Sequence, residues 1–172
     1  NRIRDLIHYL NTWVAFKDPP EHGRLRSILN AGFVQREIES LRPRIEQAVD
    51  RLLDDMEEQR EVDFIAAFAF PLPATVIMFL CGLPPEDMDA LKGWSEMMKP
   101  FIGSATSSPD KYDQAQRGAV EMAGYFREVV RARRREPGSD IISKLVLHKG
   151  TDPGLTEDEI IGCCMLFLFG GH

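Results

Sequence analysis

The sequence predicts a mainly α-helical domain. Apolar residues recur at the three- and four-residue spacing of helices along most of the chain, and no run alternates apolar and polar residues for long enough to supply a sheet. Prolines and glycines separate these periodic stretches. With 172 residues, 44% of them hydrophobic and 28% charged, the chain has an ordinary globular composition and enough length to bury a core.

Each expected helix has its own start or stop signal. Asp18, Asp140 and Thr156 are of the types that cap helix N-termini, and each precedes a stretch with helical apolar spacing. Glu21 follows Asp18 by three positions, and Glu159 follows Thr156 by three, as in a capping box. Pro43 is expected to break or restart the second helix. Loops are expected over 104–110 and 148–154. The expected helices follow Asp18, span Ile38–Met56, Pro71–Cys81, Pro84–Phe101 and Lys111–Arg135, and follow Asp140 and Thr156.

Composition excludes several classes of protein. A net charge of −6 with interspersed acids and bases argues against a nucleic-acid binder. The longest apolar run, Ile160–Gly171, is shorter than the ~20 residues that span a bilayer, so no membrane partner is expected. Cys81, Cys163 and Cys164 stand in apolar surroundings without a metal-binding spacing, and no signal peptide is visible. We therefore expect buried thiols in a reducing compartment, the cytoplasm.

The helix after Asp18 places two nitrogen donors on its apolar stripe. At ~100° per residue, the sector within ~60° of His22 contains Leu25, Arg26, Leu29 and Phe33. A buried arginine needs an anionic partner, so we expect an anion to meet Arg26 and to accept a hydrogen bond from His22. Three interpretations stay open: a core Asp or Glu, an arginine that reaches solvent at the edge of the stripe, or a ligand with carboxylates in an apolar pocket.

The last helix is apolar on every face from Ile160 to Phe169, which predicts a central, buried helix. It then runs into Gly170 and Gly171, which each weaken a helix by ~1 kcal/mol relative to alanine. Close helix packing or a kink would explain them. A flat ligand lying against the backbone would also explain them, because a side chain would clash there.

Together these stretches resemble the bacterial cytochrome P450 family. "FKDPPEHGRLRSILNAGF" is similar to the family's helix C motif, DPPEH followed by R-x-R, and "LRPRIEQAVDRLLDDM" is similar to its helix D. "VDFIAAFAFPLPATVIMFLCGLPPED" resembles the helix E region and the turn into helix F, and "GSDIISKLV" with "LTEDEIIGCCMLFLFGGH" resembles the approach to helix I. The resemblance implies one partial domain over residues 1–172, the P450 fold from helix C to helix I. The family's loop with the haem-ligand cysteine would lie beyond it.

The resemblance also implies roles for particular residues. His22 and Arg26 would bind the haem propionates. Gly170 and Gly171 would fill the first places of the family's [AG]-G-x-[ED]-T-[TS] motif and form the groove where oxygen binds. Leu166 and Phe169, on the preceding turn, would approach the haem or the substrate.

Three further assignments follow the same resemblance. Residues Arg2–Val14 would form the variable loop before helix C, and Met97–Ile102 would end helix F; both regions contact substrate in the family. Arg24 would face outward, either as part of the surface where redox partners dock or as a solvated arginine.

The function implied is a haem b-dependent monooxygenase, an oxidoreductase that inserts one oxygen atom from O2 into a small organic substrate. Its electrons would come from a ferredoxin- or flavodoxin-type partner. Two alternatives stay open: a non-enzymatic helical module that binds a partner, and an inactive, truncated family member. The helical module leaves the His22/Arg26 pair and the two closing glycines unexplained.

Overall fold

The computed structural model describes residues 2–33, 35–57, 60–103, 110–148 and 154–171. Within these ranges the regular structure is entirely helical and contains no strand, so the predicted fold class is confirmed. Most of the two loops expected over 104–110 and 148–154 lies outside the described residues, as does His172.

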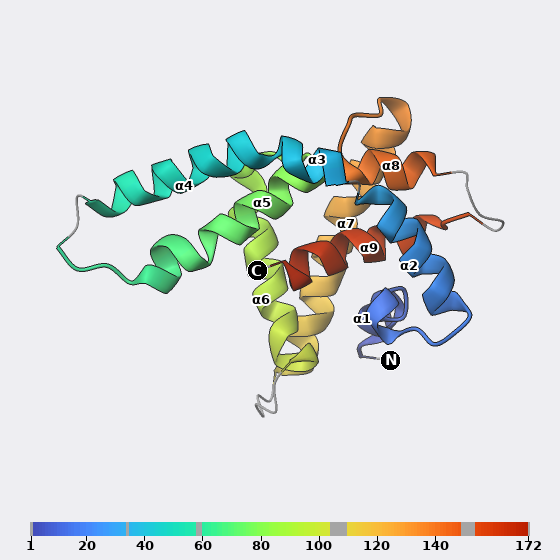
Figure 1. Ribbon diagram of the computed structural model, residues 1–172. Helices are drawn as coiled ribbons and strands as arrows, with labels where there is room; N and C mark the ends of the chain where they lie inside the picture. The colour runs from blue at the N-terminus through green and yellow to red at the C-terminus, as the bar shows by residue number, and fades with distance from the viewer. Residues whose placement is uncertain (1, 34, 58–59, 104–109, 149–153, 172) are drawn as a thin grey trace.

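Helix α7 (Lys111–Arg135) is the axis of the fold and has the predicted bounds. It packs along α6 (Met88–Ile102) and also contacts α1 (Arg4–Leu10), α8 (Ile141–Leu147) and α9 (Glu157–Gly170). Figure 1 shows α9 passing across α7 in the middle of the molecule. The close approach of α6 depends on Gly118, because a Cβ atom there would overlap the Trp94 carbonyl oxygen. Small residues on one face of α7 thus let two helices meet at backbone distance.

Helix α9 is central, as its apolar sequence predicts. Its buried residues are Ile160, Ile161, Gly162, Cys163, Cys164, Met165 and Leu168. The predicted capping box is present: Thr156 Oγ1 accepts the Glu159 N–H at 3.2 Å, and Glu159 Oε2 accepts the Thr156 N–H at 2.8 Å. The capping box fixes where α9 begins.

Helix α2 (Glu21–Gly32) begins later than the sequence predicts. Asp18 does not cap it; Pro20 occupies the N-cap position and has no side-chain cap. Asp18 contributes its carbonyl oxygen, which accepts the His22 N–H at 3.0 Å. The two prolines form the turn that precedes the helix, which leaves the Asp18 side chain too far upstream to cap it.

The segment before α2 is also more regular than expected. Most of Arg2–Val14 forms helix α1 instead of a loop, and the 3-10 turn η1 (Val14–Phe16) follows it. Gln116 on α7 fixes the start of α1, since its Oε1 accepts the Leu6 N–H at 3.0 Å and its Nε2 donates to Asp5 at 2.7 Å.

The remaining helices extend to one side of α7 (Figure 1). The break at Pro43 is confirmed, because α3 (Gln35–Ser40) and α4 (Arg42–Glu57) are separate helices. The π-helical turn η2 (Ile65–Ala69) leads into α5 (Pro71–Cys81), which ends at Gly82 in the left-handed conformation with φ 63°. The 3-10 turn η3 (Pro85–Asp87) connects it to α6. No helix of the described residues combines the length and apolar character needed to cross a membrane.

Candidate functional site

Helix α2 presents His22 and Arg26 one turn apart at its N-terminal half. His22 is half-buried and Arg26 is exposed. Within the described residues neither side chain makes a hydrogen bond or an ion pair with the protein. The expected burial of Arg26 is therefore wrong for the described chain, and so is the alternative that it pairs with an internal carboxylate. The exposed side chain matches the alternative of an arginine that reaches solvent at the edge of the stripe, and the ligand interpretation stays a prediction.

The buried face of α2 explains this difference. Its buried residues are Leu25, Ile28, Leu29 and Gly32. The centre of this set lies about 110° from Arg26 and about 90° from Arg24 on a helical wheel. The two arginines therefore flank the buried face on opposite sides, and neither lies at its middle. The helical wheel centred on His22 omitted Ile28 and Gly32, which turn the buried face away from Arg26.

Arg24, expected to face outward, is directed toward the interior. Its guanidinium pairs with the Glu159 carboxylate on α9, and 22% and 14% of the two side chains remain exposed. An anion was expected at Arg26, but the internal carboxylate pairs with Arg24 instead. The outward, solvated position expected for Arg24 is wrong, because its side chain extends along the side of α2 that faces α9.

The two closing glycines differ in their surroundings. A Cβ atom on Gly170 would meet no atom within 4 Å, whereas one on Gly171 would overlap the Ile77 side chain and the Phe167 carbonyl oxygen. Close packing therefore explains Gly171. Gly170 leaves its backbone uncovered at this point.

The two apolar candidates on α9 are half-buried. Leu166 packs against the core, and the Phe169 ring lies 5.4 Å from the Trp13 ring. Trp13 is itself almost fully buried, and its indole Nε1 has no hydrogen-bond partner among the described residues. No motif or spacing in the sequence marks Trp13 as a site residue. Its contact with Phe169 joins the segment before α2 to the end of α9.

The cysteines behave as structural residues. All three are free and buried. Burial raises the pKa of the Cys81 thiol and that of the Cys163 thiol to about 12 each, and it also raises the pKa of the Cys164 thiol well above its ordinary value. A thiol that stays protonated is neither a nucleophile nor a metal ligand. The described residues also contain no group of three His, Cys, Asp or Glu side chains that could hold a metal ion.

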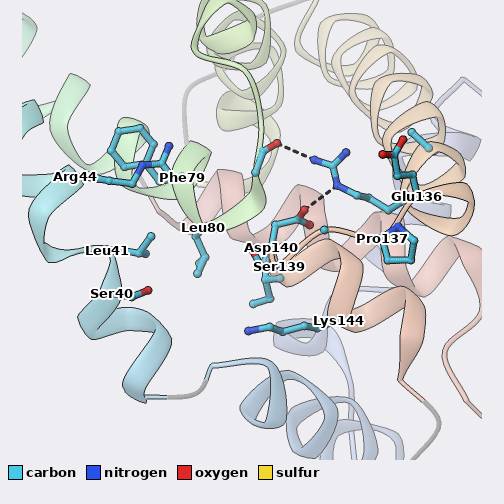
Figure 2. A pocket seen from close by; sticks show the side chains of 15 residues that line it. Ser40, Leu41, Arg44, Phe79, Leu80, Glu136, Pro137, Ser139, Asp140 and Lys144 are labelled. Atoms are coloured by element: carbon cyan, nitrogen blue, oxygen red, sulfur yellow. Dashed lines mark hydrogen bonds and ion pairs between the residues drawn. The ribbon is translucent and has the colours of Figure 1, made fainter.

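A cavity of about 640 Å³ lies away from these residues, among the first turn of α4, the end of α5, the end of α7 and α8. Figure 2 shows two of its cations beside protein partners: the Arg44 guanidinium lies 3.9 Å from the centre of the Phe79 ring, and Arg133 donates to Asp140 and to the Gly82 carbonyl. None of the predicted site residues lines this cavity. The predicted residues instead gather on α2 and α9.

The chain is similar to cytochrome P450s over almost its whole length. It is 34% identical to a biotin biosynthesis cytochrome P450 of Bacillus subtilis over 171 residues, which are 99% of this chain and 43% of the relative. It is 39% identical to cytochrome P450 107B1 of Saccharopolyspora erythraea over 165 residues, 96% of this chain and 38% of the relative. The chain thus spans about two fifths of the curated relatives it matches. No family model matches it.

A solved structure agrees with these relatives. The crystal structure of P450BioI, in complex with an acyl carrier protein ligated with hexadec-9Z-enoic acid, superposes with a TM-score of 0.90 at 35% identity. The match covers 99% of this chain and 43% of that one.

Proposed function

Because this chain belongs by sequence and by fold to the bacterial cytochrome P450 family, we propose that the protein carrying it is a haem-dependent monooxygenase. It inserts one oxygen atom from O2 into a small organic substrate and receives electrons from a ferredoxin- or flavodoxin-type partner. The cofactor is haem b, whose axial cysteine is not among these residues. The three cysteines remain free thiols, which supports a reducing, cytoplasmic compartment.

The residues of α2 fit the acidic edge of a haem. His22 and Arg26 lie one turn apart and have no protein partner among the described residues, so both can donate to propionates. Hydrogen bonds between an arginine and a carboxylate are charge-assisted and strong. The proposal rests most directly on the similarity to cytochrome P450s, and these two donors, one turn apart on one helix, support the propionate role within it.

The end of α9 fits the flat face of the same group. Gly170 has open space where a side chain would project, so a planar molecule can approach its backbone. Gly171 packs against Ile77 on α5, which fixes the backbone beside it. Leu166 and Phe169 would then provide apolar contacts for haem or substrate. The bound haem would supply oxygen activation, while these residues orient the reactants and exclude water.

The proposal is tested on the full-length protein, reduced and saturated with carbon monoxide. A thiolate-ligated haem shifts the main absorption band to the red, and we expect that band. Its absence would contradict the assignment. The helical-module alternative predicts no haem uptake at all, and an inactive family member predicts the band without oxygenated product from any substrate.

The Arg26→Ala substitution tests the propionate contact. Losing a charge-assisted hydrogen bond worth ~1.5–3 kcal/mol should accelerate haem dissociation by roughly 10- to 150-fold. The measurement is the rate of haem transfer to apomyoglobin. Arg51→Ala, which removes an exposed arginine of α4, is the matched control and should leave the rate unchanged. An unchanged rate in Arg26→Ala would exclude the propionate role.

A further inference from the structure

One ion pair connects the two helices that carry the candidate site. The Arg24 guanidinium on α2 donates from Nη2 to Oε1 of Glu159 on α9, across 135 positions of sequence. Both side chains are largely buried. Helix α2 otherwise packs mainly on α8 and η1. The ion pair is therefore the polar link between the helix with His22 and Arg26 and the helix that ends at Gly170.

Glu159 uses its two carboxylate oxygens for two different purposes. Oε1 accepts from Arg24, while Oε2 accepts the Thr156 N–H at 2.8 Å and the Thr156 hydroxyl at 3.1 Å. The same side chain thus fixes the start of α9 and binds α9 to α2. A carboxylate held by its own helix start has little freedom to follow an arginine that moves.

Because α9 is a continuous helix, the position of Glu159 at its start also determines where Gly170 lies at its end. Gly170 lies 11 residues after Glu159, which is three helical turns plus about 20° of rotation and ~16 Å of rise. Glu159 and Gly170 therefore lie on nearly the same face of the helix. Farther along, the Phe33 ring at the end of α2 meets the Phe167 ring of α9 edge-on at 5.3 Å. Two contacts, one near each end, define how α9 lies against α2.

Stability alone is a poor explanation for this ion pair. Taking charges partly out of water is unfavourable even though 22% and 14% of these side chains stay exposed, and a well-packed apolar pair is often as stable. Arg24 Nη1 is also buried and has no hydrogen-bond partner in the described structure, so the desolvation of the guanidinium is only partly offset. Buried ion pairs of this kind are best attested where they select one arrangement of packed elements.

We propose that Arg24 and Glu159 are positioning residues that set the propionate-binding donors of α2 in register with the oxygen groove of α9. The inference rests on the proposed function. Neither residue is assigned a contact with the haem; each would act through the helix that carries it. Haem retention and ligand binding at the groove should therefore change together when the pair is removed.

The experiment uses the full-length haem protein and two variants. Glu159→Gln removes the charge but keeps a side chain that can complete the capping box. The double variant Arg24→Met/Glu159→Gln also removes the cation, so no unpaired charge stays buried and folding is preserved. Glu157→Gln is the matched control, because Glu157 belongs to the same first turn of α9 but pairs with Arg134 on α7.

Three quantities are measured on each protein: the melting temperature, the rate of haem transfer to apomyoglobin, and the rate of carbon monoxide rebinding after flash photolysis. The last two report on the propionate side and the groove side, and both are normalised to bound haem. We expect the double variant to lose haem roughly tenfold faster and to rebind carbon monoxide at least a few-fold differently, since small misplacements have large effects. Glu159→Gln should lie between it and the unaltered protein, and Glu157→Gln should match the unaltered protein.

The outcomes separate the two proposals. If the double variant folds and both haem rates equal those of the unaltered protein, the positioning role is wrong while the proposed function stands. A lower melting temperature with unchanged haem rates shows a purely structural ion pair and also overturns the inference. An unaltered protein that binds neither haem nor carbon monoxide overturns the proposed function itself.

Discussion

Gly170 and Gly171 are neighbours, yet they differ in the space available for a side chain. The Cβ position of Gly170 is free, while that of Gly171 is filled by the Ile77 side chain and the Phe167 carbonyl oxygen. An alanine at position 170 meets no steric obstacle, and alanine favours a helix more than glycine does. An alanine at position 171 forces the packed Ile77 side chain and the Phe167 carbonyl group to move.

Alanine substitutions should therefore separate the two positions. Gly170→Ala should leave stability unchanged or raise it by up to ~1 kcal/mol. Gly171→Ala should lower it by ~1–3 kcal/mol through overpacking. The two variants of the full-length protein are compared by urea denaturation followed by circular dichroism. If both substitutions changed the free energy of unfolding equally, the two glycines would not have different surroundings.

The two arginines of α2 show what a sequence can specify at this scale. The sequence predicts that Arg26 meets an anion and that Arg24 faces outward, and the structure reverses the two: Arg24 pairs with Glu159 and Arg26 is exposed. The R-x-R spacing cannot say which arginine is paired, because the answer depends on Ile28 and Gly32, which rotate the buried face toward Arg24. The spacing also cannot identify the partner of the arginine. Glu159 has the sequence pattern of a capping-box residue, and Arg24, which it also binds, lies 135 positions away in the sequence. Local signals therefore predicted the caps of α8 and α9 but not that of α2, and tertiary packing determines which arginine is paired.

At the scale of elements, Asp140 shows how a predicted cap becomes a junction. As predicted, it caps α8, because Oδ1 accepts the Ser143 N–H at 2.9 Å. Its other oxygen accepts from Arg133 Nε at 2.8 Å, and Arg133 also donates to the Gly82 carbonyl at 2.8 Å. Three elements, α5, α7 and α8, thus meet through one carboxylate. Arginines in the last turn of α7 complement the helix dipole, and Arg133 makes a specific interhelical contact as well.

Two substitutions at Asp140 should separate its roles. Asp140→Asn keeps an oxygen that can cap α8 but removes the charge that pairs with Arg133, and should cost ~1–2 kcal/mol of stability. Asp140→Ala removes both and should cost ~2–4 kcal/mol, since it also leaves a half-buried arginine without its carboxylate. Thermal unfolding of the full-length variants measures both effects. Asp54→Ala on exposed α4 is the control and should change stability little; an Asp140→Ala variant as stable as this control would contradict the junction.

The elements themselves were predictable because each has a strong local pattern. α7 and α5 have the bounds that their periodicity, prolines and Gly82 indicate. The helical form of Arg2–Val14 was not predictable in the same way. That helix is short and its start is capped by Gln116, a residue of α7 far along the chain. Short elements whose caps come from elsewhere in the fold have no local signature.

At the scale of the whole molecule, burial is uneven. The core gathers on α7 and α9, whereas no described side chain of α4 is fully buried. Beside α4, the π-helical turn and the residue before it expose large apolar side chains: Phe64 is 54% exposed and Ile65 is 67% exposed. Figure 1 shows α4 and this turn extending to one side of the core. An exposed apolar surface of this kind is typical of a surface that packs against further protein. The chain spans about two fifths of the length of the relatives it matches.

Hydrogen exchange should reveal this division. In residues 1–172 produced alone, amides of α4 should exchange within seconds to minutes, while those of α7 and α9 exchange far more slowly, because local opening depends on the number of buried contacts. In the full-length protein α4 should become protected by at least roughly tenfold, since each 1.4 kcal/mol of added local stability slows exchange by that factor. Mass spectrometry of peptic peptides measures both proteins under the same conditions. The α7 peptides are the internal control and should change much less. Protection of α4 that is equal in the two proteins would mean that this helix gains nothing from the rest of the chain.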